Sequence, residues 1–150
     1  RNAIRIVSVN QDTPYHALVT IEYTYIGVPA LPAGMGLTAI VRASNVAEPW
    51  DAPGNIVSDV GWTTRSLPTR SSSAVFELLY APGIHSGGLV SASETTNLIS
   101  LEMYFSDETT GGAPFVTVHV PYPMNWNRPP DSLDLPVPTS FWVRGMQVQP

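Results

Sequence analysis

Hydrophobic and polar side chains alternate most regularly in residues 18–25. Side chains of an extended strand point to opposite faces in turn, so this stretch has one apolar face and one largely polar face. The apolar face carries β-branched and aromatic residues, which suit a half-buried pleated surface. The apolar positions are Val19, Ile21, Tyr23 and Tyr25. We predict a strand here, with the rest of the chain packed around it.

Similar alternation predicts several more strands. Ile4 to Val9 begins with apolar residues at even positions and continues with apolar residues at odd positions, which indicates a bulge or a strand that changes sheets. Both faces of Ala74–Tyr80 are apolar, so we expect that strand near the middle of a sheet. The remaining predicted strands are Leu37–Ala43, Ile99–Phe105 and Phe115–Val120, with weaker candidates at Val57–Thr63 and Leu89–Ser93.

Turn residues separate these segments. A polar loop with two glycines, Ser106–Pro114, joins two strands and predicts a hairpin. Residues 64–73 are polar, and we interpret them as a turn. Because 15 Pro and 11 Gly punctuate the chain and no window repeats apolar residues at helical spacing, we predict no helix.

These features together predict an all-β fold, an antiparallel β-sandwich of about seven to nine strands. The alternation in Ile4–Val9, Leu18–Tyr25, Leu37–Ala43 and Leu98–Phe105 resembles the immunoglobulin-like or fibronectin-like modules of bacterial and archaeal surface proteins. The chain has no cysteine, so the paired Cys of true immunoglobulin domains is missing. The resemblance implies a sandwich architecture at residues 1–120.

Residues 121–150 differ in character from the rest. Proline lacks the N–H that a sheet ladder needs, so we expect Pro121–Pro130 not to pair regularly. A strand-like segment follows this proline-rich arm. Its apolar residues are Phe141, Trp142, Val143, Met146 and Val148. The segment either folds back to complete its own sandwich or pairs with the edge of a neighbouring copy, as in donor-strand complementation. The first strand, with Ile4 and Ile6, is a second candidate for such an interface.

Composition narrows the range of partners. Charged residues make up 13% of the chain, against roughly 25% in a typical soluble domain. The net charge is −5 and the seven basic residues are scattered, which argues against nucleic acid as a partner. No apolar run reaches the roughly 20 residues of a membrane span. The chain begins at Arg1, which we interpret as a processed N-terminus or an excised fragment of an extracellular or cell-surface protein.

No catalytic motif stands out. His16, His85 and His119 lack metal-ligand spacing, and Ser86 is not in a G-x-S-x-G elbow. Glu22, Glu77 and Glu102 alternate with apolar neighbours, so we expect them on solvent faces. Asp107 and Glu108 form a small oxygen-rich loop, which is a candidate calcium site without the usual repeated spacing. We therefore predict a protein that is not an enzyme and needs no cofactor.

Two functions from different classes follow. The first is a structural subunit or module that assembles with copies of itself or with neighbouring domains through a terminal strand. The second is a carbohydrate-binding or adhesion module, in which Trp50, Trp62 or Trp126 stacks on sugar rings. These tryptophans can equally be buried in the core or in a protein interface.

Overall fold

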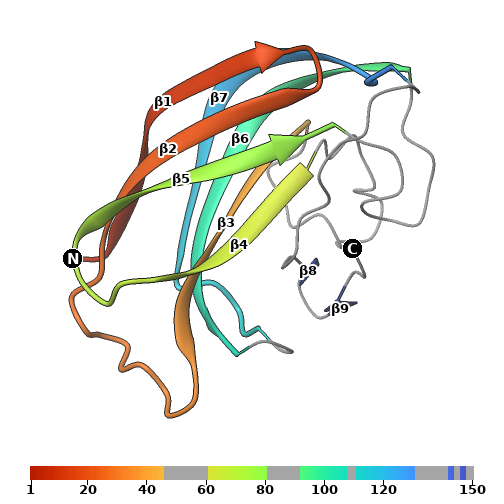
Figure 1. Ribbon diagram of the computed structural model, residues 1–150. Coiled ribbons are helices and arrows are strands. Elements are labelled where there is room, and N and C mark those ends of the chain that lie inside the picture. The colour runs from red at the N-terminus through yellow and green to blue at the C-terminus, as the bar shows by residue number, and fades with distance from the viewer. Residues whose placement is uncertain (46–60, 81–91, 108–110, 131–141, 144–145, 148–150) are drawn as a thin grey trace.

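The chain forms two antiparallel sheets that pack face to face (Figure 1). The computed structural model describes residues 1–45, 61–80, 92–107, 111–130, 142–143 and 146–147; residues 61–65, 142–143 and 146–147 are described by their backbone alone. The described residues are all-β and contain no helix, so they include none long and apolar enough to cross a membrane. This confirms the predicted fold class at the level of an all-β, sandwich-like structure.

The first sheet has the order β1-β2-β5, and the second has the order β4-β3-β6-β7. A separate two-stranded sheet pairs β8 with β9. The strands are β1 (Ala3–Thr13), β2 (His16–Thr24), β3 (Gly36–Ser44), β4 (Gly61–Leu67), β5 (Ser72–Leu79), β6 (Ser93–Ser106), β7 (Val116–Asn127), β8 (Trp142–Val143) and β9 (Met146–Gln147).

Strand β2 lies in the centre of the first sheet, as its alternation predicts. Its inward residues Val19 and Ile21 are fully buried. The face switch in the first strand corresponds to a shift of register between Ile6 and Ser8, which leaves Val7 46% exposed. The predicted bulge is therefore confirmed, although β1 continues to Thr13, beyond the predicted end at Val9.

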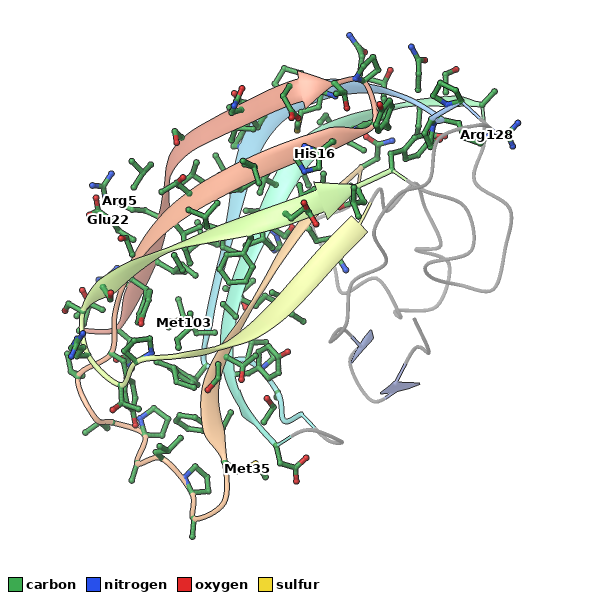
Figure 2. All side chains as sticks on the ribbon, in the orientation of Figure 1. Arg5, His16, Glu22, Met35, Met103 and Arg128 are labelled. Atoms are coloured by element: carbon green, nitrogen blue, oxygen red, sulfur yellow. The ribbon has the colours of Figure 1, made fainter. Side chains whose placement is uncertain are left out.

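The core lies between the two sheets. Figure 2 shows Met103 of β6 inside this layer, where it is fully buried. Burial of these apolar side chains supplies most of the stabilisation, at roughly 25 cal/mol per Å² of apolar surface removed from water. The largest fully buried side chains are Trp126, Tyr104, Phe76, Ile21, Leu37, Leu78, Ile99, Leu101, Met103, Val19 and Val41.

Three expectations about strands are wrong. Strand β5 is at the edge of its sheet in the described residues, and the apolar residues on its outward face are Leu79, which is buried, and Val75, which is 46% exposed. Residues 64–67 belong to β4 and pair with β3 instead of forming a turn. Of the weaker candidates, residues 57–60 and 89–91 lie outside the described residues.

The third correction concerns the prolines. Strand β7 runs through Pro121 and Pro123 to Asn127 and pairs with β6 on both sides of a register shift. Proline is tolerated in edge strands and at bulges. Among the described strands β7 is at the edge of its sheet, and its register shifts between Thr96 and Leu98, where these prolines lie. The strand also crosses the expected boundary at residue 120 without a break.

Candidate functional site

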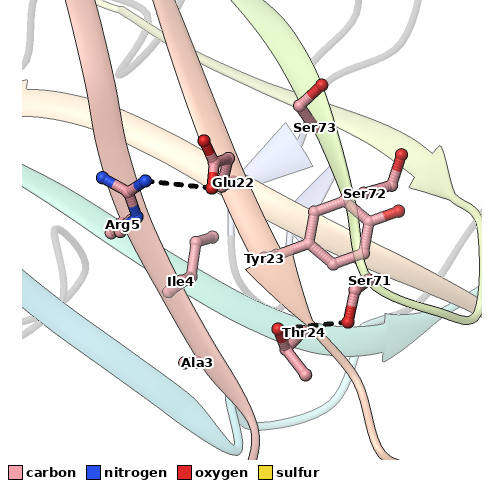
Figure 3. A pocket seen from close by; sticks show the side chains of 9 residues that line it. All are labelled: Ala3, Ile4, Arg5, Glu22, Tyr23, Thr24, Ser71, Ser72 and Ser73. Carbon is pink, nitrogen blue, oxygen red and sulfur yellow. Dashed lines mark hydrogen bonds and ion pairs between the residues drawn. The ribbon is translucent and has the colours of Figure 1, made fainter.

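A shallow pocket of about 510 Å³, lined mostly by polar residues, lies where the first sheet meets the turn before β5 (Figure 3). Strands β1, β2 and β5 each contribute side chains to it. Arg5 and Glu22 are opposite each other in the β1–β2 register, and Ser73 is opposite Glu22 in the next pair. The lining residues are Ala3, Ile4, Arg5, Glu22, Tyr23, Thr24, Ser71, Ser72 and Ser73.

The polar groups of this pocket largely bind one another. The Nη2 of Arg5 lies 3.0 Å from the Oε2 of Glu22, and the Oγ of Ser71 donates to the Oγ1 of Thr24 at 3.2 Å. Because the Arg5 and Glu22 side chains are 66% and 49% exposed, this ion pair contributes only about 0–1 kcal/mol. The pocket has no net charge and many hydroxyl groups, which suits a polar, uncharged ligand such as a peptide backbone.

The one aromatic residue of the pocket is not available for stacking. Tyr23 is 3% exposed, and its hydroxyl donates to the carbonyl of Pro68 at 2.9 Å, which holds the β4–β5 turn against β2. No ring face therefore opens into this pocket for a sugar.

The other end of the same sheet carries a histidine between two carboxylates. Figure 2 shows His16 and the Arg5–Glu22 pair at opposite ends of the sheet. The Nδ1 of His16 is hydrogen-bonded to the Oδ1 of Asp12, and its Nε2 lies 2.8 Å from the Oε2 of Glu77. The three residues come from β1, β2 and β5. Protonated His16 therefore connects all three strands of the sheet.

This arrangement shifts the pKa values of His16 and Asp12. Burial lowers the pKa of His16, but the hydrogen bonds and charges of Asp12 and Glu77 outweigh it, and the net pKa lies above the ordinary value of 6.5. The hydrogen bond from His16 lowers the pKa of Asp12 below its ordinary value of 3.8. Only an imidazolium can donate from both ring nitrogens, so the cluster is complete only when His16 is charged.

We predict that folding stability decreases as the pH rises through the folded-state pKa of His16. A pKa raised by folding means that the folded protein binds the proton more tightly, so the stabilisation is present in full below the unfolded pKa and is lost above the folded one. The lowered pKa of Asp12 stabilises the folded protein above the unfolded-state pKa of this carboxyl group. This stabilisation is lost as the pH falls through the folded-state pKa. Urea unfolding between pH 3 and pH 9 should therefore show a maximum between these two titrations.

Glu77→Gln is the matching variant, because it keeps the shape of the side chain and removes one of the two charges. An NMR titration of His16 should show a midpoint above 6.5 in the wild type and a lower midpoint in Glu77→Gln. Identical midpoints in the two proteins would rule out the cross-strand contact as the cause.

The second sheet carries buried polar residues on its outer face. The register places Trp62, Arg42, Ser100 and His119 in one row across β4, β3, β6 and β7. The Oγ of Ser100 lies 2.9 Å from the Nδ1 of His119, but Ser100 is 3% exposed and is no accessible nucleophile.

The three glutamates are spread over both sheets. Glu22 pairs with Arg5, Glu77 pairs with His16, and Glu102 is on the other sheet. Glu102 is 8% exposed, so its expected place on a solvent face is wrong. Among these three, no two carboxylates face a common point where they could act on one glycosidic bond.

The predicted interface residues divide between the core and the terminal segment. Ile4 is 4% exposed and belongs to the core of its own chain, and Ile6 packs against that core. Trp142 and Val143 form β8, and Met146 lies in β9, which pairs with β8. Within the described residues neither strand pairs with the two main sheets. Phe141 and Val148 lie outside the described residues.

The three candidate sugar-stacking tryptophans have different outcomes. Trp126 is 1% exposed, its Nε1 donates to the Oγ1 of Thr96 at 3.1 Å, and its ring packs against Tyr80 at 6.2 Å between centroids. This burial removes Trp126 as a stacking candidate. Trp62 is in β4, where only its backbone is described, and Trp50 lies outside the described residues. Stacking by these two stays a prediction.

The calcium candidates are only partly within the described chain. Asp107 is exposed at the end of β6, and Glu108 lies outside the described residues. In the described part of the chain, no group of three or more His, Cys, Asp or Glu side chains is placed to hold a metal ion.

Sequence reasoning missed the His16 cluster. Glu77 is 61 residues from His16 and carries no spacing signal. Asp12 is closer: the sequence indicates a turn at Gln11–Tyr15, and the tight turn at Pro14–Tyr15 brings Thr13 opposite His16 and Asp12 near the imidazole.

Comparison of the chain with protein-family models, with curated protein sequences and with solved structures found no significant match.

Proposed function

We propose that this chain is a non-catalytic, extracellular structural protein that joins neighbouring copies through its C-terminal segment. The observation that carries the proposal is the separate β8–β9 pair, which is part of neither main sheet in the described residues. A terminal strand outside its own sandwich is the element that strand exchange requires. The low content of charged residues, 13%, suits a surface that packs against other subunits.

The strand order supports an immunoglobulin-like or fibronectin-like sandwich within this proposal. Strands one, two and five form one sheet, while strands three, six and seven form the core of the other. This division corresponds to strands A, B and E against C, F and G of the immunoglobulin architecture. The fourth strand pairs with the third, in the place that a C′ strand takes.

The four strands at the edges of the two main sheets, as described, differ in how well they could accept an added strand. Bulges, prolines and charges are the usual protection of an exposed edge. Strand β1 has register shifts at Ile6–Ser8 and Asn10–Thr13, and β7 has a shift and two prolines. Strands β4 and β5 pair with their neighbours without any shift and contain no proline. The register shifts and prolines are thus confined to the side of the sandwich formed by β1 and β7.

Strand β5 is the better acceptor of the two regular edges in this proposal. Its first residues, Ser72 and Ser73, line the neutral, hydroxyl-rich pocket, which suits the backbone of an incoming strand. A contact between the terminus of one copy and an edge strand of the next is heterologous, so it propagates as a fibre wherever the rotation between copies does not close a ring.

We expect deletion of residues 139–150 to abolish assembly. Electron microscopy and light scattering of the full chain should show filaments or concentration-dependent growth, and the truncated chain should stay monomeric and folded. A truncated chain that unfolds, in a protein whose full-length form never assembles, would mean that the segment completes its own core.

Ser73→Lys tests the acceptor edge without shortening the chain. Lysine on an edge strand opposes pairing with another strand, and a loss of about tenfold in assembled material corresponds to about 1.4 kcal/mol. Thr117→Lys is the matched control, because Thr117 is also exposed on an edge strand but lies on the protected side. Equal loss in both variants would contradict β5 as the acceptor, and no loss in either would contradict strand addition to these edges.

A further inference from the structure

The connection from β2 to β3 is an uncharged apolar loop at one end of the sandwich. The sequence has no charged residue between Glu22 and Arg42. Three large aliphatic side chains on this loop are open to solvent: Ile26 is 55% exposed, Val28 is 68% exposed and Leu31 is 37% exposed. Figure 1 shows the loop, in orange, extending beyond the ends of the strands, so it can approach a surface before the sheets do.

The loop is held in place by side chains from its base. Asn2 acts from both ends of its amide: its Nδ2 donates to the carbonyl of Val28 at 2.6 Å, and its Oδ1 accepts from the N–H of Ile26 at 2.9 Å. The hydroxyl of Tyr25 donates to the carbonyl of Pro29. At the far end, the N–H of Met35 donates to the carbonyl of Pro32 at 3.1 Å. The exposed side chains are thus presented by an ordered backbone.

These bonds also prepare the loop for an apolar environment. An unsatisfied backbone N–H or C=O costs free energy wherever water is excluded, so segments that enter lipid bind their polar groups internally. Here the carbonyls of Val28, Pro29 and Pro32 and the N–H of Ile26 already have partners. Pro29 and Pro32 have no N–H to satisfy.

Apart from this loop itself, the described surface offers no cluster of large exposed hydrophobic residues as a counterpart in a second copy. Its other large exposed hydrophobic residues, Val7 and Val75, are single residues on opposite edge strands of the first sheet, with β2 between them. The loop is also unlike a protein-binding hot spot, which is rich in Trp, Tyr and Arg and poor in Leu and Val. Its one aromatic residue, Tyr25, is 7% exposed.

We propose that this loop inserts into the surface of a neutral lipid bilayer, with Ile26, Val28 and Leu31 in contact with the acyl chains. Exposed aliphatic side chains on a loop that carries no charged residue gain from transfer into hydrocarbon, and exposed apolar surface of this kind is typical of a membrane or protein contact. The net charge of −5 disfavours anionic lipids, so the fitting headgroup is zwitterionic.

The test is flotation of the full chain with vesicles of pure phosphatidylcholine. The wild type should float with the vesicles, and Val28→Asp should lower the bound fraction by about tenfold or more, because a carboxylate opposes entry into the apolar layer. Val7→Asp is the matched control: Val7 is 46% exposed on β1, away from the loop, and the change adds the same charge. Thermal unfolding of each variant confirms that it is folded.

Three results would overturn the proposal. The first is a wild type that does not float with phosphatidylcholine, or a Val28→Asp variant that floats equally well. The second is binding only to vesicles that contain phosphatidylserine, which would place the contact on scattered arginines. The third is a wild type that dimerises without lipid and a Val28→Asp variant that stays monomeric, which would make the loop a protein contact. Assembly through β8–β9 is measured separately, so either proposal can fail alone.

Discussion

Replacing Trp126 by alanine is expected to lower the free energy of unfolding by about 3–5 kcal/mol. The side chain is 1% exposed and is the largest in the core, so its removal leaves a cavity that the neighbouring sheets can fill only in part. Stabilities of single domains are about 5–15 kcal/mol, so this one change removes a large share. Urea unfolding at constant pH measures the effect through the midpoint and slope.

Two variants separate the cavity from the hydrogen bond. Thr96→Val removes the acceptor of the Trp126 N–H while keeping the size of the side chain, and it should cost about 1–3 kcal/mol because it leaves a buried donor unsatisfied. Trp126→Phe keeps an aromatic ring, so its loss of unfolding free energy should lie between the losses in Trp126→Ala and Thr96→Val. A cost below about 1 kcal/mol for Trp126→Ala would mean that the site is not the packed core described for it.

The position of Trp126 extends the consequence beyond stability. The next two residues attach the end of β7 to other parts of the sandwich: the N–H of Asn127 donates to the carbonyl of Pro14, and the N–H of Arg128 donates to that of Ala92, both at 2.9 Å. Trp126 therefore anchors the point from which the C-terminal arm departs. A change in assembly caused by Trp126→Ala would be an effect of this anchor and not of a lost sugar platform.

Alternation along the chain predicted the strands whose environment matches their own pattern. Strand β2 has one buried face and one polar face, and the sequence shows this directly between Val19 and Tyr25. The bulge at Ile6–Ser8 was also predictable, because an extra residue reverses the parity of every apolar position after it. The β6–β7 hairpin followed from two such strands around Gly111 and Gly112, next to the Ser106–Gly111 bridge.

The errors arose where burial depends on neighbours in space. The alternation of Ala74–Tyr80 indicates two apolar faces, but not whether another strand pairs beside it. Glu102 and Arg42 alternate with apolar residues as solvent-facing positions do, yet they are 8% and 5% exposed. Pro121 and Pro123 forbid a central strand and not an edge strand, and the sequence does not state which strand is at an edge.

The candidate sites were less predictable than the fold for the same reason. The Arg5–Glu22 pair and the Asp12–His16–Glu77 cluster join strands whose register sets the contact. Apart from the Asp12–His16 contact across the turn at Pro14–Tyr15, no local spacing encodes these contacts. The loop at residues 26–35 is rich in glycine and proline in the sequence, but the sequence does not show that Ile26, Val28 and Leu31 are exposed.

Replacing Tyr25 by alanine is expected to cost about 3–5 kcal/mol and to release the β2–β3 loop. The ring of Tyr25 packs edge-on to Phe105, with 5.9 Å between the ring centroids, and its centroid lies 6.0 Å from that of Phe115. The ring centroids of the two phenylalanines are 4.7 Å apart. This aromatic cluster closes the end of the core from which the loop projects. Urea unfolding measures the loss of unfolding free energy. A loss as small as that for substitution of an exposed surface residue would contradict the described packing.

Tyr25→Phe distinguishes packing from loop order. It keeps the ring and removes only the hydrogen bond to the carbonyl of Pro29, so it should cost about 0.5–1.5 kcal/mol. Hydrogen exchange of the amides in residues 26–35 should nevertheless become faster, because the loop opens locally without global unfolding. Ile26, Val28 and Leu31 are unchanged in this variant. A weaker binding to phosphatidylcholine vesicles would then measure what ordering the loop contributes, since a disordered loop loses more conformational entropy when it binds.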